Sequence, residues 1–279
     1  MTVGVTGAAG FLGMLVTAEL KKRGHNAYRL TRNPSAESLA SADAVIHLAG
    51  EPVFQRWTQQ AKQSIYESRV NGTRNLIAAI AKNVTRPAIL VCASAVGIYG
   101  SRPDEILTES SAHGSDFLAR VVIDWEQAAL AAESLGIRVV SLRFGIVLGK
   151  GGALRAMLLP FKLGVGGRLG SGKQWMSWIH VEDAVNLVLF ALENNSVHGA
   201  FNATAPHPVT NEEFTQTLAH TLHRPAIFPV PQFGLRLLFG EMADTLVGGQ
   251  RVIPAAAQAA GFQFQYPELT PALANLLSQ

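Results

Sequence analysis

Up to about residue 204, short apolar runs alternate with longer segments in which apolar residues recur at helical spacing. The apolar runs predict strands over 3–6, 27–31, 44–48, 89–93, 138–142 and 200–203. The longer segments predict helices over 11–22, 58–82, 117–134 and 183–193. The runs AILVCASA (88–95) and RVVSLRFGIVLG (138–149) are continuous, as in strands buried on both faces. The predicted fold class is therefore α/β, with a doubly wound parallel sheet and helices on both of its faces.

After residue 149 the sequence becomes rich in glycine and then in proline. Glycines at 151, 152, 164, 166, 167, 170 and 172 punctuate a loop-rich stretch, and prolines at 206, 208, 225, 229 and 231 break up the last part. We predict a core domain over 1–149, to which 177–204 return. Segments 150–176 and 205–279 would form a smaller substrate-binding lobe over the carboxyl edge of the sheet, hereafter the small lobe.

Composition narrows the class of protein. Of 279 residues, 48% are hydrophobic and 15% are charged, which excludes disorder and a coiled coil. The net charge of +3 is weak evidence for nucleic-acid binding, so no nucleic-acid partner is expected. A single cysteine, Cys92, excludes an intramolecular disulfide and argues against a metal site. No apolar stretch approaches a membrane span, and Gly7 begins a motif too early for a signal peptide. We expect a soluble cytoplasmic protein without a membrane partner, and a homodimer is compatible with the sequence.

A glycine loop follows the first predicted strand and opens the first predicted helix. It reads Gly7-Ala8-Ala9-Gly10-Phe11-Leu12-Gly13. In such loops the first glycine makes a tight turn, the second admits a pyrophosphate, and the third lets the helix pack on the strand. The N–H groups of the helix then face the phosphates. The loop predicts a dinucleotide site, against the alternative of an ordinary glycine-rich turn.

The second predicted strand ends in a turn that bears on the choice of dinucleotide. NAD-binding proteins place an acidic residue there, which accepts a hydrogen bond from the ribose 2′-OH. This chain has Thr31-Arg32-Asn33 and no acid before Glu37. A guanidinium suits a 2′-phosphate, so NADP is predicted; the alternative is that Arg32 is a solvated loop charge.

Four motifs resemble the extended short-chain dehydrogenase/reductases, the NAD-dependent epimerase/dehydratase superfamily. They are TGAAGFLG (6–13), DAVIHLAG (43–50), SAVGIYG (94–100) and SWIHVEDA (177–184). Longer stretches at 107–129, 151–180, 205–214 and 251–269 resemble the YfcH-type epimerase family protein group. The resemblance covers the whole chain and implies a Rossmann domain with a substrate lobe and bound NADP.

The same resemblance implies which residues hold the cofactor. Gly7, Gly10, Phe11, Leu12 and Gly13 would hold the pyrophosphate. Thr31 and Arg32 would hold the 2′-phosphate, His47, Leu48 and Ala49 would lie on the adenine and ribose side, and Arg69 would face the cofactor.

The superfamily's catalytic Tyr-x-x-x-Lys pair is missing from this chain. Residues four after Tyr28, Tyr66, Tyr99 and Tyr266 are Arg32, Val70, Pro103 and Thr270. The counterparts of the pair are Leu118 and Val122, and the catalytic serine aligns with Ala95, beside Ser94. The candidate catalytic residues are Ser94, Tyr99, Glu126 and His180. As alternatives, Tyr99 is a packed loop aromatic, Glu126 a solvated helix residue and His180 a structural histidine.

A long acid-free stretch bears on the substrate. Between Glu133 and Glu182 there is no acidic residue but there are seven cations, Arg138, Arg143, Lys150, Arg155, Lys162, Arg168 and Lys173. Gathered at a cleft they would hold an anion such as a nucleotide-sugar or another phosphorylated metabolite; the alternative is a generic basic surface. Two functions remain open. One is an NADP-dependent oxidoreductase or epimerase-like enzyme with non-standard acid/base groups, and the other is a non-catalytic NADP-binding sensor or scaffold.

Overall fold

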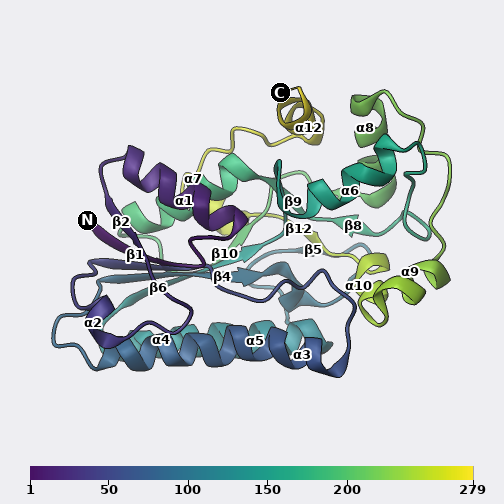
Figure 1. The fold of residues 1–279 in the computed structure, drawn as a ribbon. Helices are drawn as coiled ribbons and strands as arrows, with labels where there is room; N and C mark the ends of the chain where they lie inside the picture. The colour runs from purple at the N-terminus through teal and green to yellow at the C-terminus, as the bar shows by residue number, and fades with distance from the viewer. Residues whose placement is uncertain (279) are drawn as a thin grey trace.

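The computed structural model describes residues 1–278, and a six-stranded sheet lies at its centre (Figure 1). Its strands are β1 (Thr2–Thr6), β2 (Asn26–Arg29), β3 (Ala44–His47), β4 (Ile89–Ala95), β6 (Arg138–Phe144) and β10 (Gly199–Ala203). They run parallel in the order β10-β6-β4-β3-β1-β2. All six predicted strands are present. The fold is of the Rossmann type, as the sequence predicts.

Helices cover both faces of the sheet (Figure 1). One layer contains α1 (Phe11–Lys22) and α7 (Val181–Glu193), and the other contains α4 (Gly72–Ala81) and α5 (Phe117–Leu130). Successive strand residues point to opposite faces, so two apolar clusters form. Val3, Val16, Leu20, Val140 and Leu187 belong to the first. Val45, Leu76, Leu90, Trp125 and Val139 belong to the second. Burial on both faces explains why the strand sequences are continuously apolar.

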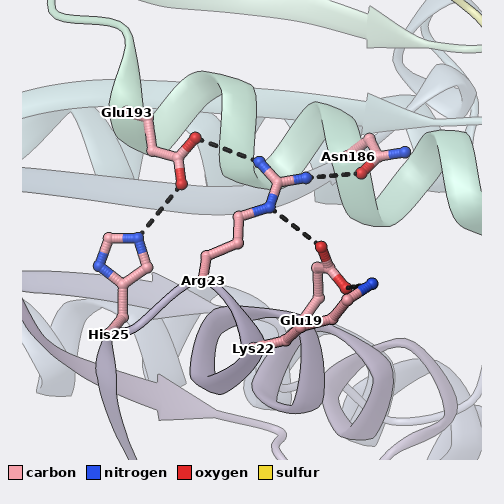
Figure 2. A network of polar contacts seen from close by, with 6 residues as sticks. All are labelled: Glu19, Lys22, Arg23, His25, Asn186 and Glu193. Atoms are coloured by element: carbon pink, nitrogen blue, oxygen red, sulfur yellow. Dashed lines mark hydrogen bonds and ion pairs between the residues drawn. The ribbon is translucent and has the colours of Figure 1, made fainter.

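The end of α1 is fastened to α7 by a polar network away from the glycine loop (Figure 2). Arg23 donates to Glu19 at 3.0 Å, Glu193 at 3.2 Å and Asn186 at 2.8 Å. His25 Nε2 lies 3.2 Å from Glu193 Oε1. These contacts fix the direction of α1, and the amino end of α1 bears the glycine loop.

The helix predicted over 58–82 is in fact interrupted. It consists of α3 (Gln59–Tyr66), a π-helical turn η1 (Glu67–Asn71) and α4. The apolar spacing on either side gives no sign of a π-turn, because the wider turn lies between two segments of ordinary periodicity. The predicted helix 117–134 likewise ends as α-helix at Leu130 and continues as a 3₁₀ turn, η3 (Ala131–Leu135).

The remaining elements complete the chain. In the first part these are α2 (Ala36–Leu39), the 3₁₀ turn η2 (Val96–Tyr99), β5 (Ile106–Leu107) and β7 (Ile146–Leu148). Later come α6 (Gly152–Lys162), β8 (Trp175–Met176), β9 (Trp178–His180), β11 (Val209–Thr210) and α8 (Asn211–Leu222). The last are α9 (Gln232–Phe239), α10 (Met242–Val247), β12 (Arg251–Val252), α11 (Ala255–Ala259) and α12 (Leu269–Leu277). Figure 1 shows α6, α8, α9 and α10 beyond the carboxyl ends of the sheet strands.

The loop after β3 connects the core to α9 and α10. Arg56 donates to the carbonyl oxygen of Leu237, and Trp57 forms a bridge with Gly240. Lys62 of α3 forms an ion pair with Glu241. The loop after β3 and the start of α3 thus contact α9 and the turn between α9 and α10 directly.

No helix among residues 1–278 is long and apolar enough to cross a membrane. The same residues contain no cluster of three or more side chains of the kinds that hold a metal ion.

Candidate cofactor and active site

The glycine loop is packed so closely that side chains do not fit. Gly7 has φ +69°, and a Cβ there would lie 2.7 Å from the carbonyl carbon of Leu48. A Cβ on Gly13 would lie 2.1 Å from the carbonyl oxygen of Gly7. Helix α1 begins after Gly10 with no side-chain cap and no acid in its first turn. Its amino end therefore offers N–H groups and a positive dipole end to an anion.

Phe11 and Leu12 are partly buried. The Phe11 ring lies against Gly149, Gly151 and Gly152, where an added Cβ would come within 3.2 Å of it. Leu12 packs against the apolar clusters on either side of α1. These two side chains fix the loop to its surroundings, so their contribution to an anion site would come from the main chain.

Arg32 lies in the exposed turn after β2, together with Thr31. Its Nη2 is 3.1 Å from Oε2 of Glu51, which follows β3. The sequence around β2 gives no sign of Glu51, because this residue is near Arg32 only through the strand order β3-β1-β2. The structure thus adds an acidic residue to the predicted 2′-phosphate site.

His47 points into the layer of α4 and α5. Its Nδ1 is 2.6 Å from Thr6 Oγ1, and its Nε2 is 3.0 Å from Thr73 Oγ1. Trp125 Nε1 also donates to Thr73 Oγ1, at 3.0 Å. The ring is 1% exposed. Any contact of residues 47–49 with a cofactor would therefore come from their main chain or from Leu48 and Ala49, which are partly exposed.

Burial of His47 predicts a pH dependence of stability. Its pKa is lowered by burial to about 4, whereas an unfolded histidine has a pKa of about 6.5. Between these values the unfolded chain binds more protons, so stability falls as the pH drops through this window, by up to about 1.4 kcal/mol per pH unit. Urea unfolding between about pH 5 and pH 7 measures the slope. In the variant His47→Asn the free energy of unfolding should depend much less on pH, and a slope equal to that of the wild type would contradict the prediction. Burial also lowers the pKa of His180, so some slope remains.

Arg69 projects from the π-helical turn toward the loop after β3. Its Nη1 donates to the carbonyl oxygen of Glu51 at 2.9 Å, and its guanidinium lies 5.2 Å from the Trp125 ring centroid. Burial lowers its pKa to about 10, partly offset by the charge of Glu51. Arg69 remains a cation, and its hydrogen bond holds the segment after β3 at Glu51.

Three of the four catalytic candidates meet at the carboxyl ends of β4 and β6. Ser94 Oγ donates to Glu126 Oε1 at 2.5 Å. Arg143 holds both carboxylate oxygens of Glu126, each at 2.8 Å. A further nitrogen of Arg143 donates to the Tyr99 hydroxyl at 2.9 Å, and that hydroxyl donates to Asn202 Oδ1 at 2.7 Å. We call these five residues the Ser94 cluster.

Burial and the neighbouring charges determine the protonation states of Tyr99 and Arg143 in the Ser94 cluster. Burial raises the pKa of Tyr99 although Arg143 opposes this, so the phenol stays protonated. Burial acts to lower the pKa of Arg143, but Glu126 and Tyr99 outweigh it and raise that pKa. Tyr99 is fully buried and positions its neighbours. Glu126 is buried, which differs from the alternative of a solvated helix residue. In the sequence Arg143 stands only as one of seven cations, and its contact with Glu126 is not predicted.

The structure does not bring His180 into the Ser94 cluster. His180 caps α7, where its Nδ1 accepts from the Glu182 N–H at 3.1 Å. Its Nε2 lies 3.2 Å from Asn275 Oδ1, and its ring stacks on Tyr266 at 3.8 Å. These contacts hold the start of α7 against Tyr266 and α12, as expected of a structural histidine.

The seven cations of the acid-free stretch do not form one cluster. Arg143 is bound to Glu126, and Arg138 donates to the carbonyl oxygens of Ala191 and Leu192 at the end of α7 and of Val197 in the loop that follows. Arg168 pairs with Glu212 at 3.5 Å. These three cations therefore already have partners, which the sequence does not show, and the anion-binding cleft stays a prediction.

Comparison with known proteins relates this geometry to a family. A family model described as the NAD dependent epimerase/dehydratase family matches residues 3–203, and a domain of unknown function, DUF1731, matches 230–276. The chain is 41% identical over 298 residues to the epimerase family protein YfhF of Bacillus subtilis (strain 168). That match spans 100% of this chain and 98% of the relative. It is 40% identical over 302 residues to the epimerase family protein SDR39U1 homolog, chloroplastic, of Arabidopsis thaliana, spanning 99% and 87% of the two chains.

Among solved structures, human epimerase family protein SDR39U1 (isoform 2) with NADPH superposes with a TM-score of 0.91. The two chains are 36% identical, and the match covers 100% of this chain and 99% of the human one. The nucleoside-diphosphate sugar epimerase of Corynebacterium glutamicum superposes with a TM-score of 0.83 at 34% identity, covering 99% of this chain and 58% of that one.

Proposed function

The chain belongs to the NAD-dependent epimerase/dehydratase family, and on that premise we propose an NADP-dependent oxidoreductase or epimerase-like enzyme. Its substrate would be a small anionic metabolite, a nucleotide-sugar or another phosphorylated compound. The observation that carries the proposal is the hydrogen bond between Ser94 and Glu126. It lies at the carboxyl ends of the sheet strands, where the glycine loop also lies.

The residues of the glycine loop fit a dinucleotide. The space that a Cβ on Gly7 or Gly13 would need is filled by backbone, so the loop keeps its tight shape, and the first turn of α1 has no acid to repel phosphate. The NADPH in the related human structure supports NADP as the dinucleotide. Gly7, Gly10 and Gly13, with the main chain of Phe11 and Leu12, would hold the pyrophosphate, and Thr31 and Arg32 the 2′-phosphate. Residues 47–49 and Arg69 would lie on the adenosine side.

Ser94 and Glu126 would do the work of the missing tyrosine and lysine. NADP, when bound, accepts or supplies the hydride. During oxidation Ser94 Oγ would take the proton of the substrate hydroxyl and pass its own proton to Glu126 Oε1, to which it is hydrogen-bonded at an O···O distance of 2.5 Å. In reduction the same two protons move back. Arg143 and Tyr99 are positioning residues, because Arg143 holds Glu126 in reach of Ser94 and Tyr99 holds Arg143.

Arg32 gives the proposal a direct test on the cofactor. A charge-assisted contact with a 2′-phosphate contributes roughly 1.5–3 kcal/mol, so Arg32→Ala should weaken NADP binding about tenfold to a hundredfold. NAD binding should stay nearly the same. Calorimetric titration of both cofactors measures this, with Lys21→Ala as a control that removes an exposed cation from the far end of α1. Equal losses for NAD and NADP, or a wild type that prefers NAD, would overturn the preference for NADP.

A second candidate function is a non-catalytic NADP-binding sensor or scaffold. Burial of the Ser94 cluster favours it, because Ser94 is only 3% exposed and Tyr99 fully buried. Leu118 and Val122 also leave α5 without the Tyr-x-x-x-Lys pair. A sensor requires that partner proteins bind the NADP-loaded and empty forms differently. Pull-downs that are indifferent to the cofactor would exclude it.

A further inference from the structure

We propose that Glu51 sets the cofactor selectivity of this chain by competing with the 2′-phosphate of NADP for Arg32. The inference rests on the proposed binding of NADP. It goes beyond that binding because it assigns an opposing role to a residue that follows a different strand.

The ion pair between Arg32 and Glu51 spans the end of the glycine loop. Strand β1 lies between β3 and β2, and the glycine loop follows β1. Arg32 follows β2 and Glu51 follows β3, and their side chains meet at 3.1 Å. The pair therefore lies where the 2′ end of a dinucleotide on this loop is expected.

The two partners differ in how firmly they are held. The N–H of Glu51 donates to Ser68 Oγ at 3.0 Å, and its carbonyl oxygen accepts from Arg69 at 2.9 Å. Arg69 is itself packed against Trp125. The Arg32 side chain is 62% exposed, and Glu51 is its one hydrogen-bonding partner in the described part of the chain. These contacts hold the main chain of Glu51, so a ligand that attracts Arg32 would draw the arginine away while the main chain of Glu51 stays in place.

The binding of NAD and the binding of NADP would therefore affect the ion pair between Arg32 and Glu51 differently. A ribose 2′-OH can donate to the Glu51 carboxylate while the ion pair stays intact, which is the chemistry that NAD-binding proteins use. A 2′-phosphate must take Arg32 from Glu51 and then lies close to an unpaired carboxylate. Glu51 therefore favours NAD and opposes NADP, and the cofactor preference of the chain would be the difference between its effect and that of Arg32.

The variant Glu51→Gln tests this with NADP and NAD themselves as titrants. It keeps the shape of the side chain and removes the charge. NADP affinity measured by calorimetry should rise about twofold to tenfold, with NAD affinity unchanged or lower. Glu67→Gln is the matched control, because Glu67 is an acid of the neighbouring π-helical turn that contacts Gln63 and not Arg32.

A double variant separates competition from simple repulsion. In an Arg32→Ala background there is no arginine to compete for, so Glu51→Gln should raise NADP affinity clearly less than it does in the wild type. An unchanged or weaker NADP affinity in Glu51→Gln would overturn the inference, and so would a gain equal to that of Glu67→Gln. An equal gain with and without Arg32 would also overturn it. A wild type that binds no NADP would overturn the proposed function as well, whereas the other results leave that function standing.

Discussion

Replacing Glu126 with alanine is expected to lower the free energy of unfolding by about 3–5 kcal/mol. The substitution leaves Arg143 buried without its carboxylate, and it also removes the acceptor of Ser94. Urea unfolding followed by circular dichroism measures the loss. The matched control is Glu133→Ala, which removes an exposed acid just after α5 and should change stability by less than about 0.5 kcal/mol. A similar small change for Glu126→Ala would show that Arg143 does not depend on Glu126.

Gly13→Ala should have the second large effect. The added methyl group would lie 2.1 Å from the carbonyl oxygen of Gly7, so α1 or the glycine loop must move. We expect a loss of about 1–3 kcal/mol in stability and, because the loop is displaced, more than about tenfold weaker NADP binding. Thermal unfolding and calorimetric titration measure the two effects.

Gly72→Ala provides the control for that substitution. Gly72 begins α4, and a Cβ there meets only the carbonyl oxygen of Glu67 at 3.9 Å. Alanine should therefore be neutral or stabilising at this position. If Gly13→Ala binds NADP as tightly as Gly72→Ala, the close packing of the glycine loop does not matter for binding.

The sheet and its main helices follow from the sequence because each has a local signal. The run AILVCASA is apolar except for Ser94, and β4 contacts α5 and α7. Helix α1 has the predicted bounds, 11–22, since a glycine precedes it and Gly24 follows it. The π-turn at Glu67–Asn71 has no such signal, although it is what directs Arg69 toward Glu51.

The partners of the site residues could not be predicted, because they come from strands that are distant in the sequence. Ser94 and Glu126 are candidates on local grounds, but Arg143, which holds Glu126, is recognisable only once β4 and β6 pair. Glu51 was missed for the same reason, since the strand order brings it to Arg32. His180 shows the converse: it was one of the catalytic candidates, but its contacts with Asn275 and Tyr266 fit the alternative of a structural histidine before a helix.

The central claim is that the Ser94 cluster supports chemistry on an anionic substrate with NADP. Stopped-flow absorbance at the NADPH band, with NADP⁺ bound to the protein and a panel of nucleotide-sugars and hydroxyl-bearing phosphorylated metabolites, tests it most directly. We predict that at least one panel member reduces the bound NADP⁺ to NADPH. In Ser94→Ala, which should retain NADP⁺ binding, the rate should be lower by about a hundredfold or more. If NADP⁺ is bound and no member of the panel reduces it, the result contradicts an enzyme and favours the sensor.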